Sequence, residues 1–337
     1  MIDIALKLVY NVGIMFLMMV PGIILKKFKF IQDGFGKGLS NLVLYIAQPA
    51  LIFLAYVRPF DKAVLTNILF VLLFSVVAHI LFAIVALKSF AREADGRRRM
   101  LRFATVFSNA AFMGIPLIGK VLGDDATIYA SVYNITFNLF LWSFGVYVCT
   151  QDRDEDGDGV TDGDVLTDYH EVKRANPLLK SLKTAVLHPV TIAALIGLIF
   201  FFLPIDSYVP GLVTEALTML KDLVIPLSMT VIGLRISDID FHGILKDKSM
   251  YLFLALRHLI LPSAIFVVMK LLSLAGLPFG EEVITVVLIM AAAPAASSAT
   301  MFAERYDCDA AYVSKLVTVS TLLSILTMPL VTMLAYI

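Results

Sequence analysis

Two apolar segments of the sequence, SNAAFMGIPLIG at 108–119 and AAAPAASSATMFAE at 291–304, each carry a proline beside polar side chains. Pro116 and Pro294 lack a backbone N–H, so a helix that continued through either would lose a hydrogen bond. An interrupted helix presents N–H groups that attract anions at one half-helix end, and carbonyls that suit cations at the other. Two interruptions that meet predict a binding site; prolines that merely kink a membrane helix are the alternative.

Amide and hydroxyl side chains near these prolines are the groups that would bind a substrate. Asn134 and Asn138 lie on a neighbouring segment and share one helix face, because they are four residues apart. Gln48, beside Pro49, either joins the site or bonds a neighbouring helix. The predicted substrate-binding residues are Gln48, Asn109, Gly114, Pro116, Asn134, Asn138, Pro294, Ser297 and Ser298.

Ionisable side chains inside apolar segments are functional candidates, because they are costly to bury. Lys221 and Asp222 lie about halfway along the apolar segment 210–235, and Asp222 is the candidate coupling group for a proton or cation. An internal ion pair, or an interfacial first half of an overlong segment, explains the same two residues. Arg257 either snorkels or neutralises an anion, and the adjacent His258 fits a hydrogen-bonded structural role.

The sequence shows no sign of enzyme chemistry or of a bound cofactor. It has no Walker-A sequence, no nucleophile–base pair and no His, Cys or Glu cluster with metal-ligand spacing. We therefore predict no enzyme, no metal and no cofactor. The acidic run at 154–162 fits the beginning of a calcium loop, but Val165 stands where the bidentate Glu is needed. The run is either such a loop or a solvated linker.

Membrane-spanning helices must position these residues. The chain of 337 residues is 59% hydrophobic and 16% charged, with a mean hydropathy of +0.88, which is more apolar than a soluble domain. Its net charge is zero, and no basic patch predicts nucleic-acid binding. The apolar residues fall into runs of about 20, the length that crosses a bilayer. Ten spans are predicted, near 4–25, 37–57, 65–87, 101–122, 127–150, 185–203, 210–235, 250–271, 282–303 and 311–336.

Charge and repeated residues organise these spans into two halves. Lys and Arg concentrate in alternate connections, which puts the long central loop in the cytoplasm and both termini outside. Five spans precede the loop and five follow it, so the second half is predicted to be inverted. Similar residues recur at nearly equal offsets, at Pro49 and Pro226, Pro116 and Pro294, and His79 and His258. The predicted parts are a first repeat at 1–150, an acidic cytoplasmic linker at 151–183 and a second, inverted repeat at 184–337.

Three stretches resemble the auxin efflux carrier family: SNAAFMGIPLIG its broken fourth helix, AAAPAASSATMFAERY its ninth and YNITFNLFLWSFGVY its fifth. The resemblance covers nearly the whole chain. It implies a fold like that of bile-acid/sodium symporters, with a mobile crossover domain and a scaffold, and substrate contacts at Asn109 and around Pro116 and Pro294. Family members move organic anions, namely auxin in plants and small carboxylates such as malonate or malate in bacteria. The short acidic loop favours the bacterial type.

The sequence therefore predicts an all-α polytopic protein of the cell membrane, with ten transmembrane helices in two inverted five-helix repeats and broken, crossing helices 4 and 9. Its predicted function is secondary transport of a small organic anion by elevator-type alternating access, with the substrate at the crossover. A passive anion channel and a ligand-sensing membrane receptor are the alternatives. The predicted partners are the organic anion, the lipid bilayer, H⁺ or Na⁺ as coupling ion and a second copy in a homodimer.

Overall fold

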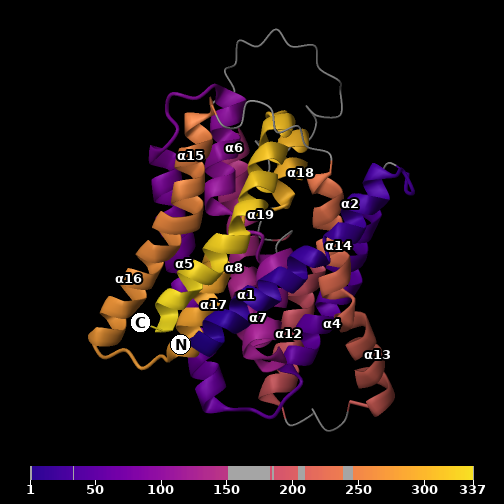
Figure 1. The fold of residues 1–337 in the computed structure, drawn as a ribbon. Helices are drawn as coiled ribbons and strands as arrows, with labels where there is room; N and C mark the ends of the chain where they lie inside the picture. The colour runs from indigo at the N-terminus through magenta and orange to yellow at the C-terminus, as the bar shows by residue number, and fades with distance from the viewer. Residues whose placement is uncertain are drawn as a thin grey trace.

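The computed structural model describes residues 2–32, 34–150, 183, 186–203, 209–237 and 246–336, and every regular element in these ranges is a helix (Figure 1). The helices before the central loop are α1 (Ile2–Leu17), α2 (Val20–Lys27), α3 (Phe35–Leu42), η1 (Val43–Ala47), α4 (Gln48–Tyr56), α5 (Lys62–Lys88), α6 (Asp95–Val106), η2 (Ala110–Gly114), α7 (Ile115–Leu122), η3 (Asp124–Ala126), α8 (Thr127–Phe140), η4 (Leu141–Gly145) and α9 (Val146–Thr150). Those after it are α12 (Pro189–Phe202), α13 (Gly211–Asp222), α14 (Val224–Ile236), α15 (Lys248–Ala255), η7 (Leu256–Ile260), α16 (Leu261–Leu274), α17 (Glu281–Ala292), α18 (Ser298–Arg305), α19 (Ala310–Thr332) and η8 (Met333–Tyr336). The acidic run at 154–162, with its calcium hypothesis, lies outside the described residues.

Seven helical stretches of the described residues are long and apolar enough to cross a membrane, and α12 and Ala110–Leu122 form shorter apolar helices. The predicted spans 101–122 and 282–303 are each interrupted. Helix α6 gives way to η2 across residues 107–109, and α17 gives way to α18 across residues 293–297; we call these two stretches the crossover segments. The all-helical, membrane-type fold is therefore confirmed, whereas the count of ten spans stays a prediction.

The crossover segments satisfy each other's backbone groups. They run antiparallel and form an isolated β-bridge. The Asn109 N–H donates to the Pro294 carbonyl at 2.6 Å, and the Ala296 N–H donates to the Phe107 carbonyl at 2.8 Å. Unpaired peptide groups are expensive away from water, so each interruption is stable because the other lies beside it.

Three π-helical turns take up the prolines of the broken and kinked helices. Turns η1, η2 and η7 each come directly before an α-helix whose second residue is proline, at Pro49, Pro116 and Pro262. A π turn holds one more residue than an α turn, and so accommodates the hydrogen bond that proline cannot donate. The interruption predicted at Pro116 consequently lies upstream of it, and Pro116 itself sits near the start of α7. Pro294, by contrast, lies in a crossover segment.

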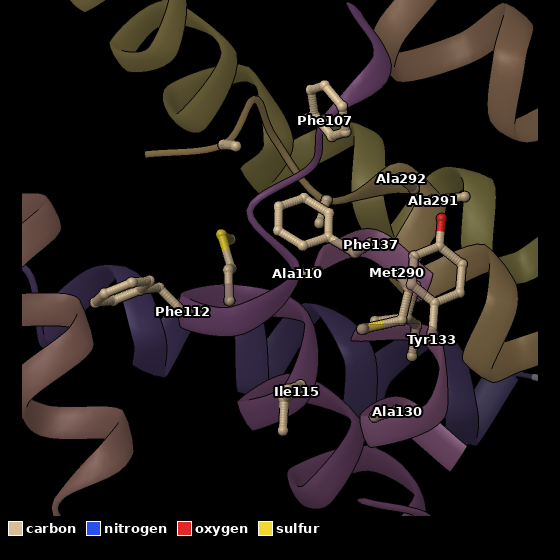
Figure 2. Close-up of a cluster of buried hydrophobic side chains, with 14 of the residues drawn as sticks. Phe107, Ala110, Phe112, Ile115, Ala130, Tyr133, Phe137, Met290, Ala291 and Ala292 are labelled. Atoms are coloured by element: carbon tan, nitrogen blue, oxygen red, sulfur yellow. The ribbon is translucent and has the colours of Figure 1, made fainter. Parts of the chain in front are cut away.

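Helix α17 forms the centre of the packed core. Its residues from Val283 to Ala292 are all buried, as expected of a helix that is apolar all round. Figure 2 shows Met290, Ala291 and Ala292 gathered with aromatic side chains of the first half, Tyr133 and Phe137 among them. Its close packing fixes the end of α17 from which the second crossover segment begins.

Helices α2 and α14 lie side by side (Figure 1) and cross at two glycines. A Cβ atom on Gly22 would lie 2.2 Å from the Thr230 carbonyl oxygen, and one on Gly233 would lie 2.0 Å from the Met19 carbonyl oxygen. Only glycine permits this approach, because both obstacles are backbone atoms that cannot rotate away.

We therefore expect Gly233→Ala to destabilise the protein by about 1–3 kcal/mol, the range typical of overpacking. Thermal unfolding in detergent measures the change. Gly13→Ala is the matched control, since a Cβ atom there meets nothing within 4 Å. Equal melting temperatures for the two variants would contradict the described crossing of α2 and α14.

Candidate functional site

The crossover brings four half-helix ends and two polar side chains to one place. The carbonyl ends of α6 and α17 point toward the crossover segments, and η2 and α18 begin just beyond them. The Asn109 side chain, which is 3% exposed, donates from Nδ2 to Ser297 Oγ at 3.2 Å. The polar residues singled out from two distant stretches of sequence are thus in direct contact.

A cavity of about 110 Å³, here named the crossover cavity, lies against these segments. Six of the nine predicted substrate-binding residues line it: Gln48, Asn109, Asn134, Asn138, Ser297 and Ser298. Asn138 Nδ2 donates to the Asn134 carbonyl at 2.9 Å, and Gln48 Nε2 donates to the Ala111 carbonyl. Amides from α4, from α8 and from the first crossover segment therefore surround one small space.

The other three predicted residues, Gly114, Pro116 and Pro294, are buried but do not line the crossover cavity. Gly114 lets η2 pack against α17, because a Cβ atom there would lie 2.7 Å from Met290 Sδ. The Pro294 carbonyl accepts the crossover hydrogen bond described above. These residues shape the backbone, whereas the polar residues face the cavity.

Four buried polar atoms around the crossover cavity have no hydrogen-bond partner among the described residues. They are Gln48 Oε1, Asn134 Oδ1, Trp142 Nε1 and His188 Nδ1. Buried polar atoms are nearly always paired in folded proteins, with protein or with ordered water, so four beside one cavity mark it as a place for water or for polar ligand atoms. The indole can only donate, whereas the imidazole nitrogen can donate or accept.

Trp142 and His188 were missed by the sequence reasoning. His188 stands immediately before Pro189 at the beginning of α12, where it reads as an ordinary flanking residue. Trp142 lies in η4, and the π turn changes which face its neighbours present. The proximity of Trp142 to Asn138 in sequence, four residues apart on an apparent helix, was the available signal.

A larger cavity of about 890 Å³ adjoins the crossover cavity, and we name it the basic vestibule. The two cavities share Ser297, Ser298, Phe112 and two other lining residues. The charged residues in the described part of its lining are Lys26, Lys37, Arg235, Lys315 and Glu304. These described residues, four cations against one carboxylate, contribute a positive potential, which favours the entry of anions.

Arg235 lies where the vestibule meets the crossover. Its guanidinium donates from Nη1 to the Ser297 carbonyl and, at 3.3 Å, to Thr300 Oγ1. Helix α14 is thereby attached to the beginning of α18. Both groups belong to the segment that carries the second interruption, so the contact ties the crossover to the helix beside it.

Helices that lead away from the crossover cavity are joined by ion pairs. Lys221 Nζ lies 2.6 Å from Asp124 Oδ2, and Arg58 Nη1 lies 3.5 Å from Asp125 Oδ1. Asp222, predicted as the coupling group, is exposed at the end of α13 and lines neither cavity. The neighbouring residue, Lys221, forms an ion pair with Asp124, as described above.

No group of three or more His, Cys, Asp and Glu side chains in the described part of the chain could hold a metal ion. The described residues that line the crossover cavity supply amides, hydroxyls, an indole and an imidazole, and none of them is a carboxylate. Such a set can bind a small polar molecule or anion by hydrogen bonds.

Comparison with known proteins agrees with these features. Residues 8–332 match the family model described as membrane transport protein, which confirms the resemblance to the auxin efflux carrier family. The chain is 24% identical over 311 residues to an uncharacterized transporter of Methanothermobacter thermautotrophicus, and the match covers 92% of each chain. It is 22% identical over 330 residues to an uncharacterized transporter of Methanocaldococcus jannaschii, covering 94% of this chain and 95% of the relative.

The unpaired atom of Asn134 leads to a stability prediction. Asn134→Leu removes a buried, unsatisfied polar group and keeps the number and branching of heavy atoms, and the crossover cavity has room for the larger methyl groups. We therefore expect a melting temperature equal to or above that of the unchanged protein. Thermal unfolding in detergent provides the measurement. Ser131→Leu is the contrasting variant, because it breaks the buried hydrogen bond between Ser131 Oγ and Tyr56 Oη at 2.8 Å and should lower the melting temperature. A clear loss of stability in Asn134→Leu would show that this amide is structural.

Proposed function

Because this chain belongs to the membrane transport protein family, we propose that it is a secondary carrier that moves a small organic anion across the cell membrane. The observation that carries the proposal is the crossover cavity, where four unpaired polar atoms and the Asn109–Ser297 contact adjoin a vestibule lined by four cations. A carboxylate would accept hydrogen bonds from the indole and from N–H groups of the amides, and charge-assisted bonds of this kind are the stronger ones. The unpaired oxygens Gln48 Oε1 and Asn134 Oδ1 only accept, so they would bind a hydroxyl or N–H group of the same molecule.

The crossover suits an anion without needing a cationic side chain in the cavity. Helix α18 begins at Ser298, beside the cavity, and its first N–H groups carry partial positive charge. Lys26, Lys37 and Lys315 supply charge in the vestibule, where water can still solvate them. The anion is thus attracted by lysines and bound by dipoles, which permits release as well as capture.

We further propose alternating access between two groups of helices. Gln48 and Arg235 come from α4 and α14, whereas Asn109, Asn138 and Ser297 come from the crossover segments and α8. A cavity whose walls belong to both groups changes its access when one group slides against the other. The proposed parts are the inverted repeats 1–150 and 184–337, joined by the linker 151–183. The ion pairs on the side away from the vestibule favour a carrier over an open channel.

Asn109→Ala tests the substrate site. Losing the side-chain amide should weaken anion binding by about 1.5–3 kcal/mol, the worth of a hydrogen bond to a charged group, which is roughly a 10- to 100-fold loss of affinity. The measurement is exchange of radiolabelled malonate, malate and auxin in proteoliposomes, with and without H⁺ or Na⁺ gradients. Asn11→Ala is the control, since Asn11 bonds only the Lys7 carbonyl on an exposed face. Unchanged exchange in folded Asn109→Ala would overturn the assignment.

Cross-linking tests alternating access. In a variant with both native cysteines replaced by serine, cysteines at Lys221 and Asp124 should react with a short bismaleimide, because these side chains form an ion pair. We expect the linked protein to lose malonate exchange while retaining malonate binding, since the linkage holds the vestibule-open arrangement. Each single-cysteine variant controls for modification alone. Full exchange by completely linked protein would exclude movement between these two helices.

A further inference from the structure

Arg257 is a fully buried cation that the proposed transport site does not yet use. It lies in η7, is 0% exposed, and takes part in none of the ion pairs of the described residues. Burying an unpaired charge costs several kcal/mol, so a structure that keeps one has a compensating interaction. The hydrogen bonds of the guanidinium identify it.

The partners of Arg257 are the carbonyl ends of both interrupted helices. Nη2 donates to the Ala293 carbonyl at 2.8 Å, and Nη1 donates to the Thr105 carbonyl at 3.4 Å. Ala293 directly follows α17, and Thr105 is in the last turn of α6. Each helix end carries about half a negative charge, so two ends together match one cation. Nε has no partner among the described residues.

The surrounding residues hold this arrangement in place. The next residue, His258, pairs through Nε2 with Ser320 Oγ at 2.8 Å. Ser320 Oγ also accepts the Ala295 N–H at 2.9 Å, and His258 Nδ1 pairs with Thr327 Oγ1 at 2.9 Å. The segment η7 is therefore bonded through α19 to the same crossover segment that Arg257 contacts.

We propose that Arg257 serves as a built-in cation of the crossover, in the position where carbonyl ends would otherwise require a bound Na⁺ or K⁺. A second part of this inference rests on the proposed function: the guanidinium is also the fixed counter-charge for the anion on the other side of the crossover segments. The crossover then needs no inorganic cation, and anion exchange does not depend on Na⁺. Arg257 is a positioning residue, since it touches the half-helix ends and lines neither cavity.

The test measures thermal stability of the purified protein in NaCl, KCl and choline chloride at equal ionic strength. The unchanged protein should melt at the same temperature in all three. Arg257→Met, which keeps an unbranched apolar stem without the guanidinium, should melt several degrees lower in choline chloride. Na⁺ or added methylguanidinium should then raise its melting temperature in a saturable manner, as a ligand of the folded state does. Arg257→Lys keeps the charge and should show no such response.

Arg99→Met is the matched control, because Arg99 is a buried arginine with a carboxylate partner, Asp95, away from the crossover. It should lose stability without recovery by either cation. Three results would overturn the inference: Na⁺-specific stabilisation of the unchanged protein, unaltered stability of Arg257→Met, or a loss in Arg257→Met that no cation restores. If Arg257→Met does not fold, the unchanged protein and Arg257→Lys still test the inference. Na⁺-specific stabilisation of either protein would overturn the inference, and the same melting temperature in all three salts for both proteins would support it.

Malonate exchange separates this inference from the proposed function. Na⁺-independent exchange by the unchanged protein, with a strong loss in Arg257→Met and partial retention in Arg257→Lys, supports both. If the protein exchanges none of malonate, malate and auxin, but the melting temperatures respond to the cations as expected, the proposal of anion transport is rejected. The proposal that Arg257 is a built-in cation is then kept. Exchange that requires Na⁺ would reject the built-in cation and keep the carrier.

Discussion

The structure depends on one constraint, that peptide groups inside a membrane must find partners within the protein. Two helices stop in the middle of the fold, and the extended residues between their halves pair with each other through Asn109 and Pro294, and through Ala296 and Phe107. Pairing uses the backbone of the crossover and leaves the side chains of Asn109 and Ser297 directed at a cavity. Neither interruption is tolerable alone, so the two halves of the chain must fold together for the site to exist.

The charged side chains around the crossover differ in how much water can reach them. Three lysines and Arg235 lie in the vestibule, the crossover cavity is lined by amides, hydroxyls, an indole and an imidazole, and the buried Arg257 contacts the carbonyl ends of the two interrupted helices. In the proposed carrier, an anion would therefore meet mobile charge first and fixed dipoles afterwards. Among the described residues that line the crossover cavity there is no carboxylate, so none of them would repel the proposed anion.

Six residues that line the crossover cavity could be picked out from the sequence, because amides and hydroxyls are rare in apolar segments. Gln48, Asn109, Asn134, Asn138, Ser297 and Ser298 stood out for that reason, and the cavity gathers them. The place of the first interruption did not follow, because the sequence marks the proline and not the π turn before it. Asp222 was predicted as a coupling group because its place within an apolar span suggested that it is buried. In the structure it is exposed at the end of α13. His188 and Trp142 reach the cavity through tertiary packing, which single-sequence periodicity does not encode.

The π turn η1, which precedes Gln48 and Pro49, has a consequence for the evolution of this chain. Such a turn holds one inserted residue in an otherwise regular helix, and it absorbs the rotation of about 100° that the insertion would otherwise impose on everything that follows. A homologue one residue shorter between 43 and 47 would form a regular α turn there and would still direct the residue aligned with Gln48 as this chain does. A single-residue gap in this stretch is therefore expected to leave the orientation of the polar residues beyond it unchanged.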